Sequence, residues 1–134
     1  MLQTGVGIVS DPLPQAAPPQ LTCIPGGQPA TTYYASISWL NVEGQEGQAS
    51  NPGSLTVEDG SALVVQPLNR PPNATAWNVY VGLSPAALAL QNPSRMPLDQ
   101  VWVQAAPVST LGQAPGSGQS PDYFRALTRV IQRG

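Results

Sequence analysis

The sequence lacks histidine and lysine altogether, and only 9% of its 134 residues carry a charge. Histidine is the usual general base and the commonest metal ligand, so its absence argues against an enzyme and against a metal or cofactor site. Five arginines against seven acidic residues give a net charge of −2, which offers no general attraction to nucleic acid or to an anionic membrane. So few charges suit a free monomer poorly and favour a subunit packed against others.

The single cysteine, Cys23, excludes an internal disulfide and a zinc site of several cysteines. We expect it to be a small apolar residue, buried or half-buried. No run approaches the roughly 18 apolar residues that a membrane helix needs. No basic segment followed by an apolar stretch opens the chain, as a secretory signal would. We therefore expect a soluble protein made in the cytoplasm, with no membrane partner.

The sixteen prolines and thirteen glycines predict many turns rather than a helical bundle. The length suits one domain with extensions, because a β-sandwich takes about 100 residues. Strand-like segments separated by turn residues occur at 21–24, 31–42, 53–57, 62–66, 77–81 and 101–103. Residues 86–91 fit either a helical turn or a short strand. The sequence thus predicts an all-β sandwich or barrel over residues 21–106.

The stretch 33–44 is the strongest strand, because apolar and small polar side chains alternate along it. The apolar set is Tyr33, Ala35, Ile37 and Trp39, and the polar set is Ser36 and Ser38. A strand sends alternate side chains to opposite faces, so we expect the first set in the core and the serines in water. Residues 41–47 then predict a turn, with 53–57 pairing back onto this strand.

The N-terminal residues 1–20 are rich in glycine, glutamine and proline, which predicts an extended arm and no helix. The arm either is a disordered leader or lies along a neighbouring molecule. Apolar side chains favour the second alternative, and the candidate contacts are Val6, Ile8, Val9 and Leu13.

The C-terminal part changes composition twice. Residues 107–120 are rich in glycine, serine, glutamine and proline, which predicts a flexible linker. Ser120-Pro121-Asp122 then forms a strong helix start, so residues 121–134 predict a short amphipathic helix. Its candidate partner-binding residues are Tyr123, Phe124, Arg125, Leu127, Arg129, Val130, Ile131 and Arg133. A helix this short needs a docking surface: a partner's groove, its own sandwich, or a membrane surface.

Two parts of the sequence carry a family resemblance. Residues 33–44 read Tyr33-x-Ala35-x-Ile37-x-Trp39-Leu40-Asn41-x-x-Gly44, and residues 71–82 lead into Trp77-Asn78-Val79-Tyr80. These segments resemble two strands of fibronectin type III domains, in reversed order. The reversed order is similar to small Ig-like or fibronectin-like modules of tailed bacteriophages. The resemblance implies an Ig-like or fibronectin III-like sandwich in the structural part of a virion.

The sequence offers few candidates for chemistry. Glu43 and Glu46 flank one turn and fit either a calcium site with backbone carbonyls or a solvated turn. Trp39, Trp77 and Trp102 fit either the core, which their strand positions favour, or a carbohydrate platform. Neither set makes a catalytic constellation.

From these features we expect a non-enzymatic virion structural protein, placed at the neck or tail and made in the host cytoplasm. It would carry no cofactor and would dock through its termini as a ring-forming homo-oligomer. Its partners would be portal, adaptor, tail or capsid subunits. The alternatives are a capsid decoration protein and a carbohydrate- or host-surface-binding module.

Overall fold

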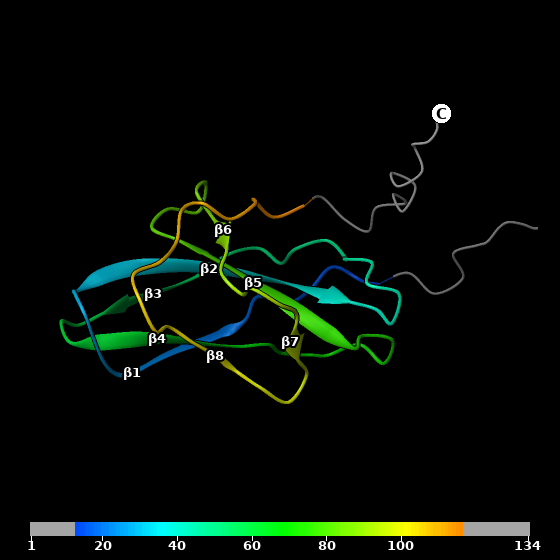
Figure 1. Cartoon of the computed structure of the whole chain (residues 1–134), viewed down its shortest axis with the longest axis horizontal. Helices are drawn as coiled ribbons and strands as arrows, with labels where there is room; N and C mark the ends of the chain where they lie inside the picture. The colour runs from blue at the N-terminus through cyan, green and yellow to red at the C-terminus, as the bar shows by residue number, and fades with distance from the viewer. Residues whose placement is uncertain (1–12, 117–134) are drawn as a thin grey trace, which may run out of the picture.

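The architecture comes from a computed structural model that describes residues 13–116. Within that range every regular element is a strand, and the eight strands form two antiparallel sheets packed as layers (Figure 1). The strands are β1 Gln20–Gln28, β2 Thr31–Leu40, β3 Gly53–Val57, β4 Ser61–Gln66, β5 Ala76–Gly82, β6 Ala89–Leu90, β7 Met96–Pro97 and β8 Trp102–Val103. The predicted all-β, two-layer class is confirmed, whereas the predicted helix 121–134 lies outside the described residues.

The two sheets differ in size and order. The smaller sheet runs β1-β4-β8, and the larger runs β3-β2-β5-β6 with β7 also paired to β5. The predicted pairing of residues 53–57 with the strongest strand is confirmed, since Tyr33 lies opposite Leu55. The ambiguous segment 86–91 contains a turn and then the two-residue strand β6. Strand β7 was not predicted, because two residues ending in a proline carry no alternation.

Strand β2 lies in the middle of the larger sheet and supplies much of the core. It pairs with β3 along its first half and with β5 from Tyr34 to Leu40. Its alternating set Tyr33, Ala35, Ile37 and Trp39 is at most 3% exposed, as predicted. Inward residues of both sheets complete one apolar cluster, including Leu63 and Val65 of β4 and Val79 and Val81 of β5.

The prediction that Ser36 and Ser38 face water is wrong, because they are 1% and 0% exposed. The chain after β2 folds back and covers this face. Ser36 donates a hydrogen bond to the carbonyl of Ser50 at 2.9 Å, and the amide of Ile37 donates to the Ser50 hydroxyl at 3.1 Å. Burial is tolerated because each small hydroxyl finds a partner.

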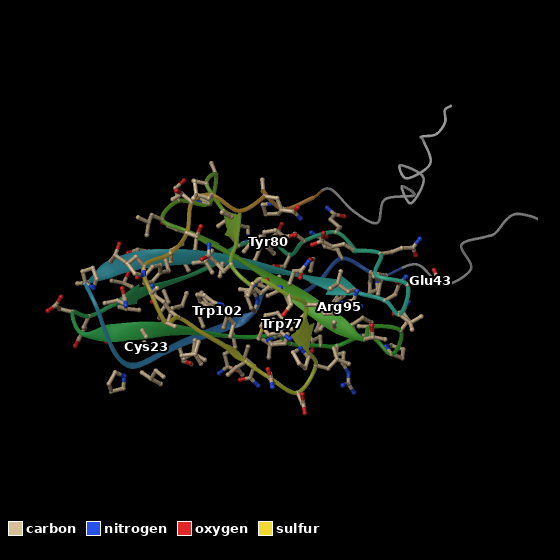
Figure 2. The ribbon with its side chains drawn as sticks, in the orientation of Figure 1. Cys23, Glu43, Trp77, Tyr80, Arg95 and Trp102 are labelled. Carbon is tan, nitrogen blue, oxygen red and sulfur yellow. The ribbon has the colours of Figure 1, made fainter. Side chains whose placement is uncertain are left out.

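The expected burial of Cys23 is also wrong, since its side chain is exposed. It lies on β1, which among residues 13–116 pairs with β4 alone and leaves its other edge open (Figure 2). An apolar residue at such an edge is covered from one side only.

The packed body extends past the predicted limits of residues 21–106 at both ends. Leu13 and Ala16 are buried, and the amide of Ala16 donates to the carbonyl of Gln48 at 3.2 Å. At the other end, the amide of Leu90 in β6 donates to the carbonyl of Gln113 at 2.9 Å. The described parts of the expected arm and linker therefore lie against the sandwich.

Candidate functional site

A polar cluster lies on the outer face of the larger sheet, on the side away from the core. Ser36 and Ser38 of β2 stand opposite Tyr80 and Asn78 of β5 in the pairing register. Because paired residues project to the same face, these four side chains form one polar patch across two strands. Its side chains are joined by a network of hydrogen bonds, which makes this patch the candidate site.

The carboxylate of Glu46 binds this patch. Its Oε2 atom accepts hydrogen bonds from the hydroxyls of Ser38 and Tyr80 and from Nδ2 of Asn78, the last at 3.2 Å. Three donors on one carboxylate make charge-assisted bonds, which are stronger than bonds between neutral groups. Glu46 therefore ties the segment after β2 to the two central strands.

A tight turn delivers Glu46 to this position. The side-chain oxygen of Asn41 accepts from the amides of Glu43 and Gln45, both at 3.0 Å. Gly44 has a φ of 81°, which glycine adopts without the steric cost of a Cβ. The chain then returns to pair Glu46 with Leu40, so its side chain comes to lie over the sheet.

A buried asparagine extends the cluster along β5. Asn92 is 4% exposed, and its Nδ2 donates to Oδ1 of Asn78 at 2.8 Å. Its own oxygen accepts from the amide of Val79 at 2.9 Å. The side-chain amides of Asn78 and Asn92 thus join β5 to the turn after β2 and to the segment after β6.

The electrostatic environment keeps Tyr80 protonated. Its side chain is 0% exposed, and burial, followed by the hydrogen bond to Glu46 and the negative charge of that carboxylate, raises the pKa of Tyr80 from 10.0 to about 12. A phenol with this pKa does not act as a base near neutral pH. The Glu46 carboxylate is meanwhile occupied by its donors, so the arrangement supports a structural role.

The two glutamates of the turn have different surroundings. Glu43 is exposed and lies at one end of the molecule, away from Tyr80, while Glu46 is half-buried on the sheet (Figure 2). The solvated-turn interpretation therefore describes Glu43 but misses the role of Glu46. Among residues 13–116 no three potential metal-ligating side chains gather.

The tryptophans are distributed as the core interpretation predicted. Trp39 and Trp77 are 1% and 0% exposed, and Nε1 of Trp77 donates to the carbonyl of Pro97 at 3.0 Å. Trp102 is half-buried and packs against the core cluster. Trp39 and Trp77 are therefore unavailable for a carbohydrate platform.

The predicted partner-binding residues lie mostly outside the described range. These are Tyr123, Phe124, Arg125, Leu127, Arg129, Val130, Ile131 and Arg133 of the tail, and Val6, Ile8 and Val9 of the arm. The remaining arm residue, Leu13, is 7% exposed and belongs to this molecule's own core. The structure thus places Leu13 inside the sandwich.

The side chains of two glutamines join separate segments of the sandwich, and the sequence did not predict either role. Nε2 of Gln91 donates to the carbonyl of Ser109, and its oxygen accepts from the amide of Ser109 at 3.0 Å. Gln104 is 4% exposed, pairs with the backbone of Leu63, and donates to the hydroxyl of Tyr33 at 3.0 Å. An isolated glutamine carries no pattern, so no local signal was available.

No family model, no curated protein and no solved structure matches this chain. In the described part of the chain, no helix is long and apolar enough to cross a membrane.

Replacing Glu46 tests its role in the cluster. We expect Glu46→Ala to lower the free energy of unfolding by about 1–3 kcal/mol, because it removes the acceptor of the buried Ser38 hydroxyl. The matched control is Glu43→Ala, an exposed glutamate of the same turn, which should change stability by less than about 0.5 kcal/mol. Urea titrations of both variants measure the difference, and equal effects would remove the special role of Glu46.

Alkaline pH tests the environment of Tyr80. Between pH 10 and about 12 the unfolded chain loses the phenol proton while the folded chain keeps it, so ionisation favours unfolding. At about 1.36 kcal/mol per pKa unit, we expect this residue to lower the free energy of unfolding by about 2–3 kcal/mol across that window. Tyr80→Phe should lack this contribution. A Tyr80→Phe protein with the wild-type alkaline slope would contradict the assignment.

Proposed function

We propose that this protein is a non-enzymatic structural subunit of a bacteriophage virion. It would be an Ig-like or fibronectin III-like module at the neck or tail that docks through its terminal segments. Its partners would be portal, adaptor, tail or capsid subunits, with many copies arranged in a ring. Three features of the molecule support this proposal: the order of the strands, the use of polar groups and the position of the chain ends.

The strand order supports the Ig-like part of the proposal. The order β3-β2-β5-β6 parallels the C′-C-F-G order of Ig-like sandwiches, in which C′ is the added strand. In the other sheet β1 and β4 take the places of strands B and E. The two-residue β8 occupies the position beside E that strand D has in that fold.

The polar side chains support a structural role. Glu46, Tyr80, Asn92 and Gln104 are engaged with one another or with the backbone, each at a point that joins separate segments of the chain. Such networks give a fixed shape and leave no reactive group free at these positions. A fixed shape is what a spacer in a large assembly requires.

The position of the chain ends is the observation that carries the proposal. At the N-terminal end, a Cβ at Gly47 would meet Leu13 at 2.9 Å, so this end lies against the segment after β2. At the C-terminal end, the carbonyl of Gln113 accepts from the amide of Leu90 in β6 at 2.9 Å, so this end lies against the edge of the larger sheet. Both described ends lie in the half of the molecule away from the β3–β4 turn (Figure 1). The arm and the tail can therefore engage one assembly from one side.

Deleting residues 121–134 tests the docking role of the tail. We expect the truncated protein to keep its circular dichroism spectrum and melting temperature, because the described core does not use the deleted residues. We expect it to be missing from purified virions assembled in its presence, as measured by mass spectrometry against the full-length chain. Equal incorporation of both chains would contradict docking through the tail. Density for this chain on the capsid shell would favour the decoration alternative.

A further inference from the structure

Residues 109–113, which we call the strap, lie along the outer edge of the larger sheet. The edge strand there is β6, and the amide of Leu90 in β6 donates to the carbonyl of Gln113 at 2.9 Å. Figure 1 shows this part of the chain, in orange, running past β6. An open sheet edge presents unpaired amides and carbonyls, and proteins often cover it with a loop. The strap covers this edge, and the chain continues from it towards the predicted tail helix 121–134.

The side chain of Gln91 fastens the first residue of the strap. Its Nε2 donates to the carbonyl of Ser109 at 2.9 Å, and its oxygen accepts from the amide of Ser109 at 3.0 Å. In an antiparallel pair, a neighbouring strand exchanges the same two backbone bonds with one residue. Gln91 is itself fixed, because its own amide donates to the carbonyl of Val79 in β5 at 2.9 Å. The glutamine therefore ties the strap to the sheet as a strand would.

A close backbone approach at Gly112 holds the other end of the strap. A Cβ atom at this position would lie 2.2 Å from the carbonyl oxygen of Leu90 and 2.9 Å from its nitrogen. Both atoms belong to the backbone of β6, so they cannot turn aside as the end of a flexible side chain can. Glycine is the residue that allows two backbones to come this close. The hydrogen bond from Leu90 to Gln113 therefore depends on glycine at position 112.

The strap is held less firmly than the chain that precedes it. Gln104 is 4% exposed, and its amide donates to the carbonyl of Leu63 at 2.9 Å. Among residues 105–116, by contrast, Val108 is the one side chain that packs against the apolar core cluster. Apart from Gly112, every residue of the strap is exposed. Segments with few buried apolar contacts and exposed hydrogen bonds open at a lower free energy than the whole domain. These features favour a strap that detaches while the sandwich stays folded.

We propose that the strap is a clasp that sets the reach of the tail. When the clasp is closed, the tail starts from Gln113 beside β6, and the step from there to residue 121 spans at most about 29 Å. When the clasp is open, the tail starts from Gln104, and the step to residue 121 spans at most about 61 Å. Opening therefore doubles the distance over which the predicted helix can meet a partner.

This inference rests on the proposed function and deepens it, because it assigns control of the tail to contacts within the sandwich. A partner whose binding site lies beyond the shorter reach binds the open form alone, and such a partner shifts the population towards that form. Until then the closed form holds the start of the tail beside one edge of the larger sheet. The clasp thus lengthens the tether without unfolding the sandwich.

Hydrogen–deuterium exchange on the full-length protein tests the clasp. Gly112→Val places side-chain atoms against the backbone of Leu90, so we expect the amides of Leu90 and Ser109 to exchange at the rate of an unstructured peptide. The amide of Gln104 and those of β5 should keep their wild-type protection. The matched control is Gly116→Val, because a Cβ at Gly116 meets no atom within 4 Å. This control should exchange as the wild type does at all of these amides.

Pulsed electron paramagnetic resonance measures the freedom of the start of the tail. Spin labels on exposed Cys23 and on Ala114→Cys report the distance from β1 to the residue that follows the strap. We expect a narrow distance distribution when glycine occupies position 112. Adding Gly112→Val should give a broad distribution, because residue 114 is then tethered from Gln104.

Three results would overturn the inference. They are unprotected amides of Leu90 and Ser109 in the wild type, unchanged exchange and an unchanged distance distribution in Gly112→Val, and loss of protection at Gln104 and β5 together with the strap. Any of these in a protein whose tail deletion still prevents incorporation into virions would remove the clasp and leave the proposed function standing. A clasp that opens as expected, in a protein whose truncated chain joins virions normally, would instead remove docking through the tail.

Discussion

The central constraint on this fold is that β2 is buried on both faces from Ala35 to Leu40, although this part of the strand carries the polar side chains of Ser36 and Ser38. A buried hydroxyl without a partner costs free energy, so Ser36 and Ser38 require acceptors on the outer side of the sheet. The segment after β2 supplies them through the carbonyl of Ser50 and the carboxylate of Glu46. That requirement fixes the position of the turn after β2, and the N-terminal segment then packs against the returning chain at Gly47.

The sequence predicts the inner half of the sandwich well and the outer half poorly. Alternation identified β2, β4 and β5 because apolar side chains at every second position leave a periodic pattern. The same alternation predicted that Ser36 and Ser38 face solvent. The sequence pattern of small polar residues is the same on a solvent-exposed face and beneath a covering loop. Their cover comes from Glu46 and Ser50, and the fit of these residues depends on the folded path of the turn. The exposure of Cys23 likewise depends on β1 being an edge strand, which follows from the order of the strands in the sheet.

The candidate site shows the same division between local pattern and long-range contact. Glu43 and Glu46 were predicted as a pair because they flank one turn. In the structure the carboxylate of Glu46 accepts hydrogen bonds from side chains of the sheet, whereas Glu43 is exposed. The hydrogen bonds between Asn92 and Val79 and between Gln104 and Tyr33 join residues 13 and 71 positions apart, and no short motif encodes such a distance. Backbone bonds from Ala16 to Gln48 and from Leu90 to Gln113 likewise join the described ends of the chain to distant segments.

Hydrogen–deuterium exchange tests the double burial of β2 most directly. The amides of Ile37, Gly47 and Ser50 each donate to an acceptor on the opposite segment, so we expect them to exchange only when the whole domain unfolds. Their protection should therefore equal that of the core amides of β5. Exchange of these three amides as fast as those of the exposed residues 42–44, under conditions where β5 stays protected, would show that the outer face of β2 opens freely and would contradict the account.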